Sequence, residues 1–390
     1  MSRVACPFCF TRIDSSHLAY QCTNRGVTQC TAEEDPERTR LTGNTLPSFP
    51  TFMPARNMPP TCPGCGAEAL RRACPQCHTA LPLAFIDTNS PTIGIVGSKG
   101  SGKSVLMMVL IRQLREQVGK RFQAAVRIAT DQPDGSEGVE AYRVNREEPF
   151  FDGHALPPAT QEDSTTNRRQ SVVMLWQGEP ARRLGVRRSG STVLSFVDTA
   201  GEDLNSYDKT FSQRYLPVCN GLIVALDPFA LPGARARLNL PPAAVLSTDG
   251  TPLEVISRIT ELLRTELRLK QHKKIKVPIA VVFTKIDAFF SGMDRGSPVM
   301  AKAPQVPGYT QADGQAVHET VRALMHDWEA SDIDVHLRLN YSDFQYFAVS
   351  ALGAEPDYDQ GRVDPGGVRP HRVEDPILWL LAKENKVASL

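Results

Sequence analysis

The stretch GIVGSKGSGKSV at residues 94–105 constrains the fold of this chain more than any other feature. A short run rich in β-branched residues, Thr92–Val96, leads into its glycine-rich turn, and a long apolar segment begins at Lys103. Gly97, followed after four residues by Gly102, Lys103 and Ser104, matches a phosphate-binding loop. In such a loop, glycines let backbone N–H groups approach a phosphate at the N-terminus of a helix. We therefore expect a strand, a phosphate-binding turn and a helix within an α/β fold, with a doubly wound and mostly parallel sheet.

The residue types in this loop predict its contacts. The Lys103 ammonium is expected to reach the outer phosphates, and the Ser104 hydroxyl to bind Mg²⁺. Lys99 adds positive charge near the phosphates or projects into solvent. The other positions expected to contact nucleotide are Gly97, Gly100, Ser101, Gly102 and Val105. The loop by itself does not distinguish ATP from GTP.

Two later strands are each followed by residues that suit a nucleotide. The segment TVLSFVDTAGED ends a strand in Asp198, an acid that can hold Mg²⁺ through water, and Gly201 can offer its backbone N–H to a γ-phosphate. The segment VPIAVVFTKIDAF is a buried strand followed by Thr284, Lys285 and Asp287. A carboxylate there can accept two hydrogen bonds from guanine, from its ring N–H and its exocyclic amine. Adenine lacks this donor pair, and the stem of Lys285 can lie over the base.

A last strand, in FQYFAVSALGA, ends in Ser350, Ala351 and Leu352, where a backbone N–H can reach O6 of guanine. The four motifs thus follow in order, each at the C-terminal end of a predicted strand, where open α/β sheets bind ligands. In these motifs residues 90–383 resemble the Ras-like, translation-factor-related (TRAFAC) class of P-loop GTPases. The resemblance implies a small-GTPase-like G domain over 90–390 that binds GTP or GDP with Mg²⁺ and hydrolyses GTP to GDP and phosphate.

The same resemblance implies a switch threonine that binds Mg²⁺. Thr160 is the first candidate, Thr165 and Thr166 are rivals, and a purely structural loop threonine is the alternative. Glu202 stands where many members carry the glutamine that orients the attacking water, and its charge would repel a γ-phosphate. Lys99 also replaces a glycine of Ras-type proteins. We therefore expect slow turnover that awaits a partner's arginine, a contribution of about 10³ to 10⁵ in rate. The expected catalytic set is Lys103, Thr160, Gly201 and Glu202.

Of the nine cysteines, all but Cys219 precede residue 78. The segment CPGCGAEALRRACPQCH carries two Cys-x-x-Cys knuckles and predicts a zinc ribbon at 62–86 with one tetrahedral Zn²⁺ site. A less regular cluster at 1–32 predicts a second Zn²⁺, with His17 as an alternative ligand. Four thiolates leave no open position for water, so we expect structural zinc. The predicted ligands are Cys62, Cys65, Cys74 and Cys77 in one site, and Cys6, Cys9, Cys22 and Cys30 in the other.

Between the two cysteine clusters, the Pro-rich segment 33–61 shows no periodicity and is expected to be a linker or an extended arm. The G domain carries two expected insertions, at 230–250 and at 291–312. Long loops beside a nucleotide site are usually functional or disordered.

Composition bears on location and partners. With 44 basic and 43 acidic residues the formal net charge is +1, so global charge points to neither nucleic acid nor an anionic membrane. No apolar run approaches the ~20 residues that span a bilayer, and the N-terminal residues lack the apolar core of a signal peptide. We therefore expect a cytoplasmic protein, with neither a membrane nor a nucleic acid as partner.

The whole layout resembles a narrower group. CPFCF … AYQC, a second cysteine pair before LPLAF, the G domain and a closing HRVEDPILWLL are similar to the bacterial double-GTPase proteins of predicted conflict systems. That resemblance implies a protein partner: an activating or effector protein, or another GTPase. Two other functions stay open. One is a scaffold that binds nucleotide without turnover, and the other is a P-loop ATPase, whose base choice would not depend on Asp287.

Overall fold

The structure is a computed structural model, and the chain folds as two compact units. The first unit combines Met1–Thr92, Ala124–Tyr142 and Asp163–Val197, and the second combines Ile93–Gln123, Arg143–Glu162 and Asp198–Leu390. The residues that the structure describes are 3–24, 28–55, 58–83, 85, 90–98, 100–129, 142–157, 172–178, 182–183, 186–187, 191–198, 215–238, 240 and 251–390.

Four parallel strands form the core of the second unit, in the order β15-β13-β12-β6. Their residues are almost all apolar and buried, as a sheet covered on both faces requires. The strand ends lie in register, with Ala225 opposite Gly97 and Phe283 opposite both Leu226 and Ala348. The bounds are Thr92–Gly97 for β6, Gly221–Leu226 for β12, Ile279–Phe283 for β13 and Phe344–Ala348 for β15.

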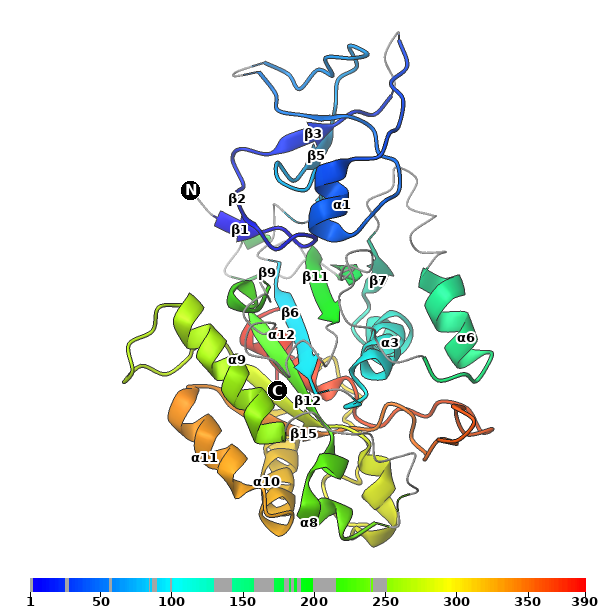
Figure 1. Cartoon of the computed structure of the whole chain (residues 1–390), viewed down its shortest axis with the longest axis vertical. Coiled ribbons are helices and arrows are strands. Elements are labelled where there is room, and N and C mark those ends of the chain that lie inside the picture. Colours follow the sequence, from blue (N-terminus) through cyan, green and yellow to red (C-terminus); the bar gives the residue numbers. More distant parts are fainter. Residues whose placement is uncertain are drawn as a thin grey trace. The chain divides into compact units, whose positions relative to one another are not determined.

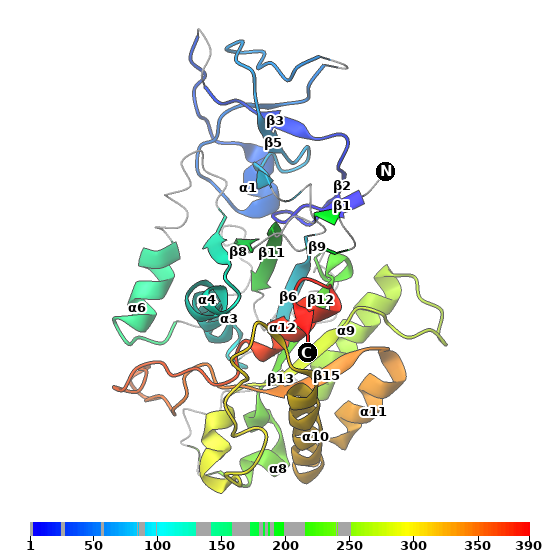
Figure 2. The ribbon, with the colours of Figure 1, turned by 180° about the vertical axis from the view of Figure 1, so that it is seen from behind.

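Helices cover both faces of this parallel sheet. Helix α9 lies in front of the strands in Figure 1, and α12 lies in front of them in Figure 2. A capping box of Thr251 and Glu254 starts α9, and the helix packs against α11. This arrangement confirms the predicted α/β fold with a mainly parallel sheet. The long helices are α3 (Lys103–Gln113), α9 (Pro252–Glu266), α10 (Gln311–Asp327), α11 (Ser331–Asn340) and α12 (Asp375–Lys383).

Short elements complete the second unit. Two of them account for parts of the predicted insertions: α8 lies in 230–250, and β14, which pairs with β16, lies in 291–312. Residues 241–250 lie outside the described part. The Arg372 side chain donates to the backbone oxygen of Ala301 at 3.0 Å, which fixes the second insertion. The bounds of the helical elements are η1 Leu114–Val118, α4 Gly119–Arg121, η2 Arg143–Glu147, α6 Glu148–Phe151, η4 Leu216–Val218, η5 Pro228–Ala230, α8 Pro232–Arg235 and η7 Ile286–Gly292, and those of the strands are β14 Gly308–Tyr309 and β16 Ala388–Ser389.

The strands of the first unit pair in antiparallel fashion. Strand β8 pairs with both β11 and β7, and β3 pairs with both β4 and β5. The remaining pairs are β1 with β2 and β9 with β10. The bounds are β1 Arg3–Ala5, β2 Arg12–Asp14, β3 Ala19–Gln21, β4 Thr51–Phe52, β5 Arg71–Ala73, β7 Ala125–Ile128, β8 Val172–Gln177, β9 Arg182–Arg183, β10 Val186–Arg187 and β11 Ser191–Asp198.

Segment 33–61 contains regular secondary structure, which differs from the expectation of a linker. It contains helix α1 (Pro36–Thr42), whose N-cap Asp35 accepts hydrogen bonds from two backbone N–H groups and whose C-cap Gly43 is left-handed. It also supplies β4, which pairs with β3. Local capping and strand pairing therefore fold this segment into the cysteine-rich part of the first unit, although it shows no apolar period. The segment boundaries within 1–86 and the start at 90 stay predictions.

One apolar cluster joins the cysteine-rich part to the larger strands of the first unit. Cys6, Cys77 and Phe85 are buried together with Val173 of β8 and Val193 of β11. The cysteine-rich part therefore packs on the antiparallel strands. Within the described residues, every helix is too short or too polar to cross a membrane.

Candidate nucleotide site and metal centres

The backbone of the phosphate-binding loop admits glycine alone at its base. A Cβ on Gly97 would lie 2.2 Å from the backbone oxygen of Ala225 on the neighbouring strand, closer than any real contact. Gly100 and Gly102 have φ values of 75° and 74°, a left-handed conformation that favours glycine. Helix α3 begins directly afterwards at Lys103, as the sequence predicts. The loop therefore presents a helix N-terminus, which attracts anions.

Polar groups inside this loop suit a phosphate. Lys103 is buried, and its ammonium donates to the backbone oxygen of Ser98 at 2.8 Å, so the charge is held against the loop. The Ser101 hydroxyl donates to the same oxygen at 2.8 Å. The buried Ser98 hydroxyl has no hydrogen-bond partner among the described residues. Buried polar atoms are rarely left unpaired, so this hydroxyl favours a polar ligand here. The sequence analysis did not single out Ser98.

Thr284 connects the phosphate-binding loop to the motif expected to bind the base. Its buried hydroxyl lies 2.8 Å from the backbone oxygen of Ser101 and 3.1 Å from that of Leu226. Residues from three neighbouring parallel strands or the turns after them thus meet at one side chain. The predicted meeting of motifs at the C-terminal edge of the sheet is present between the phosphate-binding loop and Thr284.

Lys285 is held by an acid that the sequence analysis missed. Its ammonium lies 2.6 Å from Oδ2 of Asp227, the residue that follows β12, and 4.8 Å from the centre of the Phe229 ring. Asp227 is 4% exposed, and its Oδ1 accepts from the Phe229 N–H at 2.9 Å. The signal available in the sequence was one acid directly after the apolar run GLIVAL. The ion pair fixes the lysine whose stem is expected to lie over a base.

Asp287 is half-buried at the start of η7. Burial first, and then the carboxylates of Glu355, Asp287 and Asp227, raise the pKa of Tyr358 well above its usual range. Tyr358 therefore lies within electrostatic range of Asp287, the acid expected to bind guanine. Tyr358 is a further residue that the sequence analysis did not name.

The Ser350 loop is fixed by backbone pairing. Ser350 and His371 exchange two backbone hydrogen bonds, of 3.0 and 2.8 Å, and the Ser350 hydroxyl accepts from the Gly353 N–H at 2.7 Å. The Leu352 oxygen accepts from the Arg369 N–H at 2.8 Å. Ala351 lies between these two anchored positions. The loop is therefore held from both sides after β15, as a backbone contact to a base would require.

The remaining predicted nucleotide residues divide into two groups. Ser104 and Val105 lie in the first turn of α3, and Asp198 is the last residue of β11, although its side chain is not described. The others lie outside the described residues, so the switch and catalytic predictions stay predictions: Lys99, Thr160, Thr165, Thr166, Gly201 and Glu202.

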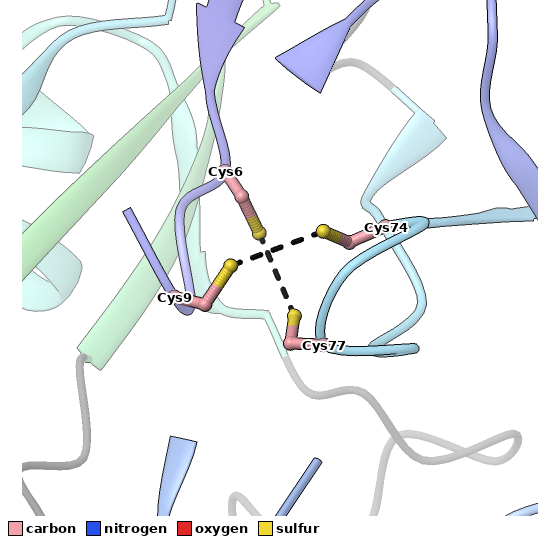
Figure 3. Close-up of side chains that lie close together, drawn as sticks. All are labelled: Cys6, Cys9, Cys74 and Cys77. Carbon is pink, nitrogen blue, oxygen red and sulfur yellow. Dashed lines mark hydrogen bonds between the residues drawn. The ribbon is translucent and has the colours of Figure 1, made fainter. Parts of the chain in front are cut away.

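The first cysteine site joins the two ends of the cysteine-rich part. Cys6, Cys9, Cys74 and Cys77 point toward one another (Figure 3), with Sγ–Sγ distances of 3.8 Å for Cys6–Cys77 and 3.9 Å for Cys9–Cys74. A tetrahedral Zn²⁺ with Zn–S bonds of about 2.3 Å separates its sulfurs by about 3.8 Å. A disulfide would need about 2.05 Å. Burial, and then the neighbouring thiols, raise the pKa of Cys6, a penalty on the thiolate that a bound cation would offset.

The second site consists of Cys22, Cys30, Cys62 and Cys65. The Cys30–Cys62 sulfurs are 3.8 Å apart and those of Cys22 and Cys65 are 3.4 Å apart. The predicted alternative His17 is not in either group; its ring instead lies 2.9 Å from the Ser16 hydroxyl. Both donor sets are all-sulfur, which suits Zn²⁺.

The predicted grouping of the cysteines is therefore wrong, although all eight belong to the two groups that could hold a metal ion. Strand β3 runs antiparallel to β5, with Ala19 opposite Ala73 and Gln21 opposite Arg71. Cys22, which follows β3, thus lies near the residues before β5, while Cys74 follows β5 beside the start of β3. The antiparallel pairing separates the two knuckles of CPGCGAEALRRACPQCH into different sites.

Comparison with known proteins finds a relative along nearly the whole chain. The chain is 27% identical, over 96% of its own length and 97% of the relative's, to a Mycolicibacterium smegmatis protein named "Putative ESX-1 scaffolding and assembly protein SaeC". No protein-family model matches.

Solved structures with a similar arrangement include several GTPase domains. The S. cerevisiae Ski7 GTPase-like domain bound to GDP and inorganic phosphate is 13% identical, with 76% of this chain and 50% of that chain covered, at a TM-score of 0.31. The Trypanosoma brucei Arl6 small GTPase with bound GppNp is 12% identical, with 77% and 100% covered, at a TM-score of 0.27.

Proposed function

We propose that the second unit binds guanine nucleotide with Mg²⁺ and works as a GTP-dependent switch that hydrolyses GTP slowly to GDP and phosphate. The Thr284 hydroxyl, 2.8 Å from the Ser101 oxygen, carries this proposal. It ties the motif expected to choose the base to the loop expected to hold the phosphates. A nucleotide bound between them would therefore meet both groups in a fixed geometry.

Different residues are proposed to bind different parts of the nucleotide. Lys103 and the N-terminus of α3 neutralise the phosphates, and the unpaired Ser98 hydroxyl can donate to them. Among the described residues, Ser104 is the candidate ligand for Mg²⁺. The bound ion would offset the negative charge of the phosphates. Asp287 accepts the two guanine donors while Asp227 holds Lys285 in place. The hydrolytic roles proposed for Thr160, Gly201 and Glu202 follow from the family resemblance alone.

The cysteine sites are proposed to hold two structural Zn²⁺ ions. Support comes from the sulfur spacing and from the small apolar core around each site, which leaves much of the folding free energy to the metal. An all-thiolate site has no open coordination position, so neither ion is proposed to take part in hydrolysis.

Nucleotide binding and turnover on the purified chain test the proposal. We expect GTP to bind in preference to ATP, and Asp287→Ala to weaken GTP binding by about a hundredfold, since it removes two hydrogen bonds to a charged group. Asp294→Ala, which removes an exposed acid a few residues further on, is the matched control and should leave GTP binding unchanged. Equal binding of ATP and GTP, unchanged by Asp287→Ala, would instead support a P-loop ATPase.

A nucleotide-binding scaffold is the second candidate. The name of the M. smegmatis relative, which refers to scaffolding and assembly, favours it, as does Glu202 in the glutamine position. A protein partner is part of either proposal. A role in a bacterial conflict system rests only on the resemblance to double-GTPase proteins. Selective GTP binding with no release of phosphate, even with partner present, would favour the scaffold over the switch.

A further inference from the structure

The loop between α9 and β13 gathers positive charge on one exposed segment of the second unit. We name residues 268–276 the basic loop. No acidic residue occurs between Leu267 and Ile286, and the loop has no Phe, Tyr or Trp. In the part of the chain that the structure describes, no ion pair involves its lysines or its arginine. Its exposed basic side chains are Arg268, Lys270, His272, Lys273, Lys274 and Lys276.

The backbone of the basic loop is fixed although its side chains are exposed. The buried Ile275 donates its N–H to the Asn340 oxygen at 2.7 Å and accepts from the Ser342 N–H at 2.9 Å. The Arg264 guanidinium donates to the Gln271 oxygen at 3.3 Å. The lysines therefore project from a rigid support, and little backbone entropy would be lost when a partner binds.

Exposed apolar side chains accompany this charge. The Ile275–Asn340 hydrogen bond joins the basic loop to the end of α11, where Leu339 is 67% exposed, and Val335, one turn earlier, is 56% exposed. On the same helix Ile333 and Leu337 are buried, so the two exposed residues lie on its outer side. Cationic and aliphatic groups are thus close neighbours on one surface.

We propose that the basic loop and the outer side of α11 dock on an anionic lipid surface. Lysine acts as a point charge that suits a field of many anionic headgroups, whereas arginine suits fixed bidentate partners. The loop extends away from the neighbouring elements in Figure 2, a shape that meets a flat surface. The lack of Phe, Tyr and Trp in the loop argues against single-stranded nucleic acid, which is bound largely by stacking.

The position of the basic loop leaves the nucleotide site accessible. The loop precedes β13, whereas the phosphate-binding loop follows β6, and these strands are parallel through β12. The basic loop therefore lies at the N-terminal ends of the parallel strands, and the phosphate-binding loop lies at their C-terminal ends. Docking is independent of the proposed nucleotide function, and it concerns a local charge that the net charge of +1 conceals.

Co-sedimentation of the full chain with vesicles tests this proposal. We expect binding to phosphatidylcholine vesicles that contain phosphatidylglycerol, weak binding to phosphatidylcholine alone, and a steep loss with rising NaCl. The triple variant Lys270→Glu, Lys273→Glu and Lys274→Glu should lower the partition coefficient at least tenfold. The milder triple change to glutamine should give an intermediate loss. Unchanged thermal unfolding would show that both variants fold.

A second triple variant supplies the control. Lys120→Glu, Arg295→Glu and Lys302→Glu change the same total charge at exposed positions elsewhere in the second unit, and should leave vesicle binding within about twofold. The proposal is overturned if this control loses as much binding, or if phosphatidylcholine alone binds equally well. It is also overturned if the wild type binds an acidic peptide or single-stranded RNA but no vesicles.

Discussion

The nucleotide site and the cysteine sites are supported in different ways. The described part of the proposed nucleotide site lies at the ends of parallel strands whose side chains are buried on both faces, so these strand ends have a packed support without any ligand. The cysteine sites lie in turns between strands of two or three residues. With so little apolar packing around the second site, the proposed zinc would supply a large part of the stability there. If both proposals hold, one region is a preformed support for its ligand, whereas the other depends on its metal for folding.

The largest expected effect separates the two cysteine sites from each other. The first shares its apolar cluster with β8 and β11, whereas the cluster around the second contains Ala67, Phe49 and Phe52 beside its cysteines. Cys74→Ser and Cys62→Ser should each reduce bound zinc from two ions to one. Cys74→Ser should destabilise the first unit more, by several kcal/mol as a rough order of magnitude. Metal analysis and thermal unfolding measure the two effects.

Cys219→Ser is the control for these variants. Cys219 is buried and belongs to neither sulfur group, so its replacement should leave the zinc content at two. If Cys62→Ser destabilised the first unit as much as Cys74→Ser, the contrast between the two clusters would be wrong. A wild-type chain that holds no zinc would refute the metal assignment itself.

A smaller effect is expected from a methyl group in the nucleotide site. Gly97→Ala places a Cβ 2.2 Å from the Ala225 oxygen, and neither backbone can move without displacing its strand. We expect a loss of about 1–3 kcal/mol in the second unit and at least a tenfold loss of GTP affinity, with two zinc ions still bound. Gly292→Ala, where the Cβ would meet nothing within 4 Å, is the matched control. Equal effects of the two substitutions would show that the strand contact does not limit the loop.

The same difference between the two regions explains why the sequence predicts the meeting of the strand-end motifs but not the grouping of the cysteines. Parallel strands place their C-terminal ends at one edge, so the order of Gly97, Thr284 and Ser350 along the chain was enough to predict that they share an edge. Cysteine knuckles do not determine their partners, because four sulfurs from any two turns can make the same tetrahedron. Only the β3–β5 pairing decides, and three-residue strands carry too weak a periodic signal to predict it.

Single polar residues were missed for a related reason. Asp227 is one acid after an apolar strand, a position that many structural residues also occupy, and only its partner shows what it does. By contrast, the start and end of α1 could have been predicted from Asp35, Pro36 and Gly43, the sequence signals of a capped helix. The absence of an apolar period outweighed them in the interpretation of 33–61 as a linker.

The smallest expected effect concerns Asp227 itself. Asp227→Asn keeps an oxygen that can accept from the Phe229 N–H but removes the charge 2.6 Å from the Lys285 ammonium. The lysine is then free to leave the Phe229 ring, so we expect GTP affinity to fall about tenfold, or ~1.4 kcal/mol, with the zinc content unchanged. Equilibrium titration with GTP and GDP measures this loss. In a Lys285→Met background the Asp227→Asn change should cost nothing further, because the residue acts through the lysine. Additive losses in that double-mutant cycle would show that Asp227 supports the strand end rather than the base-binding lysine.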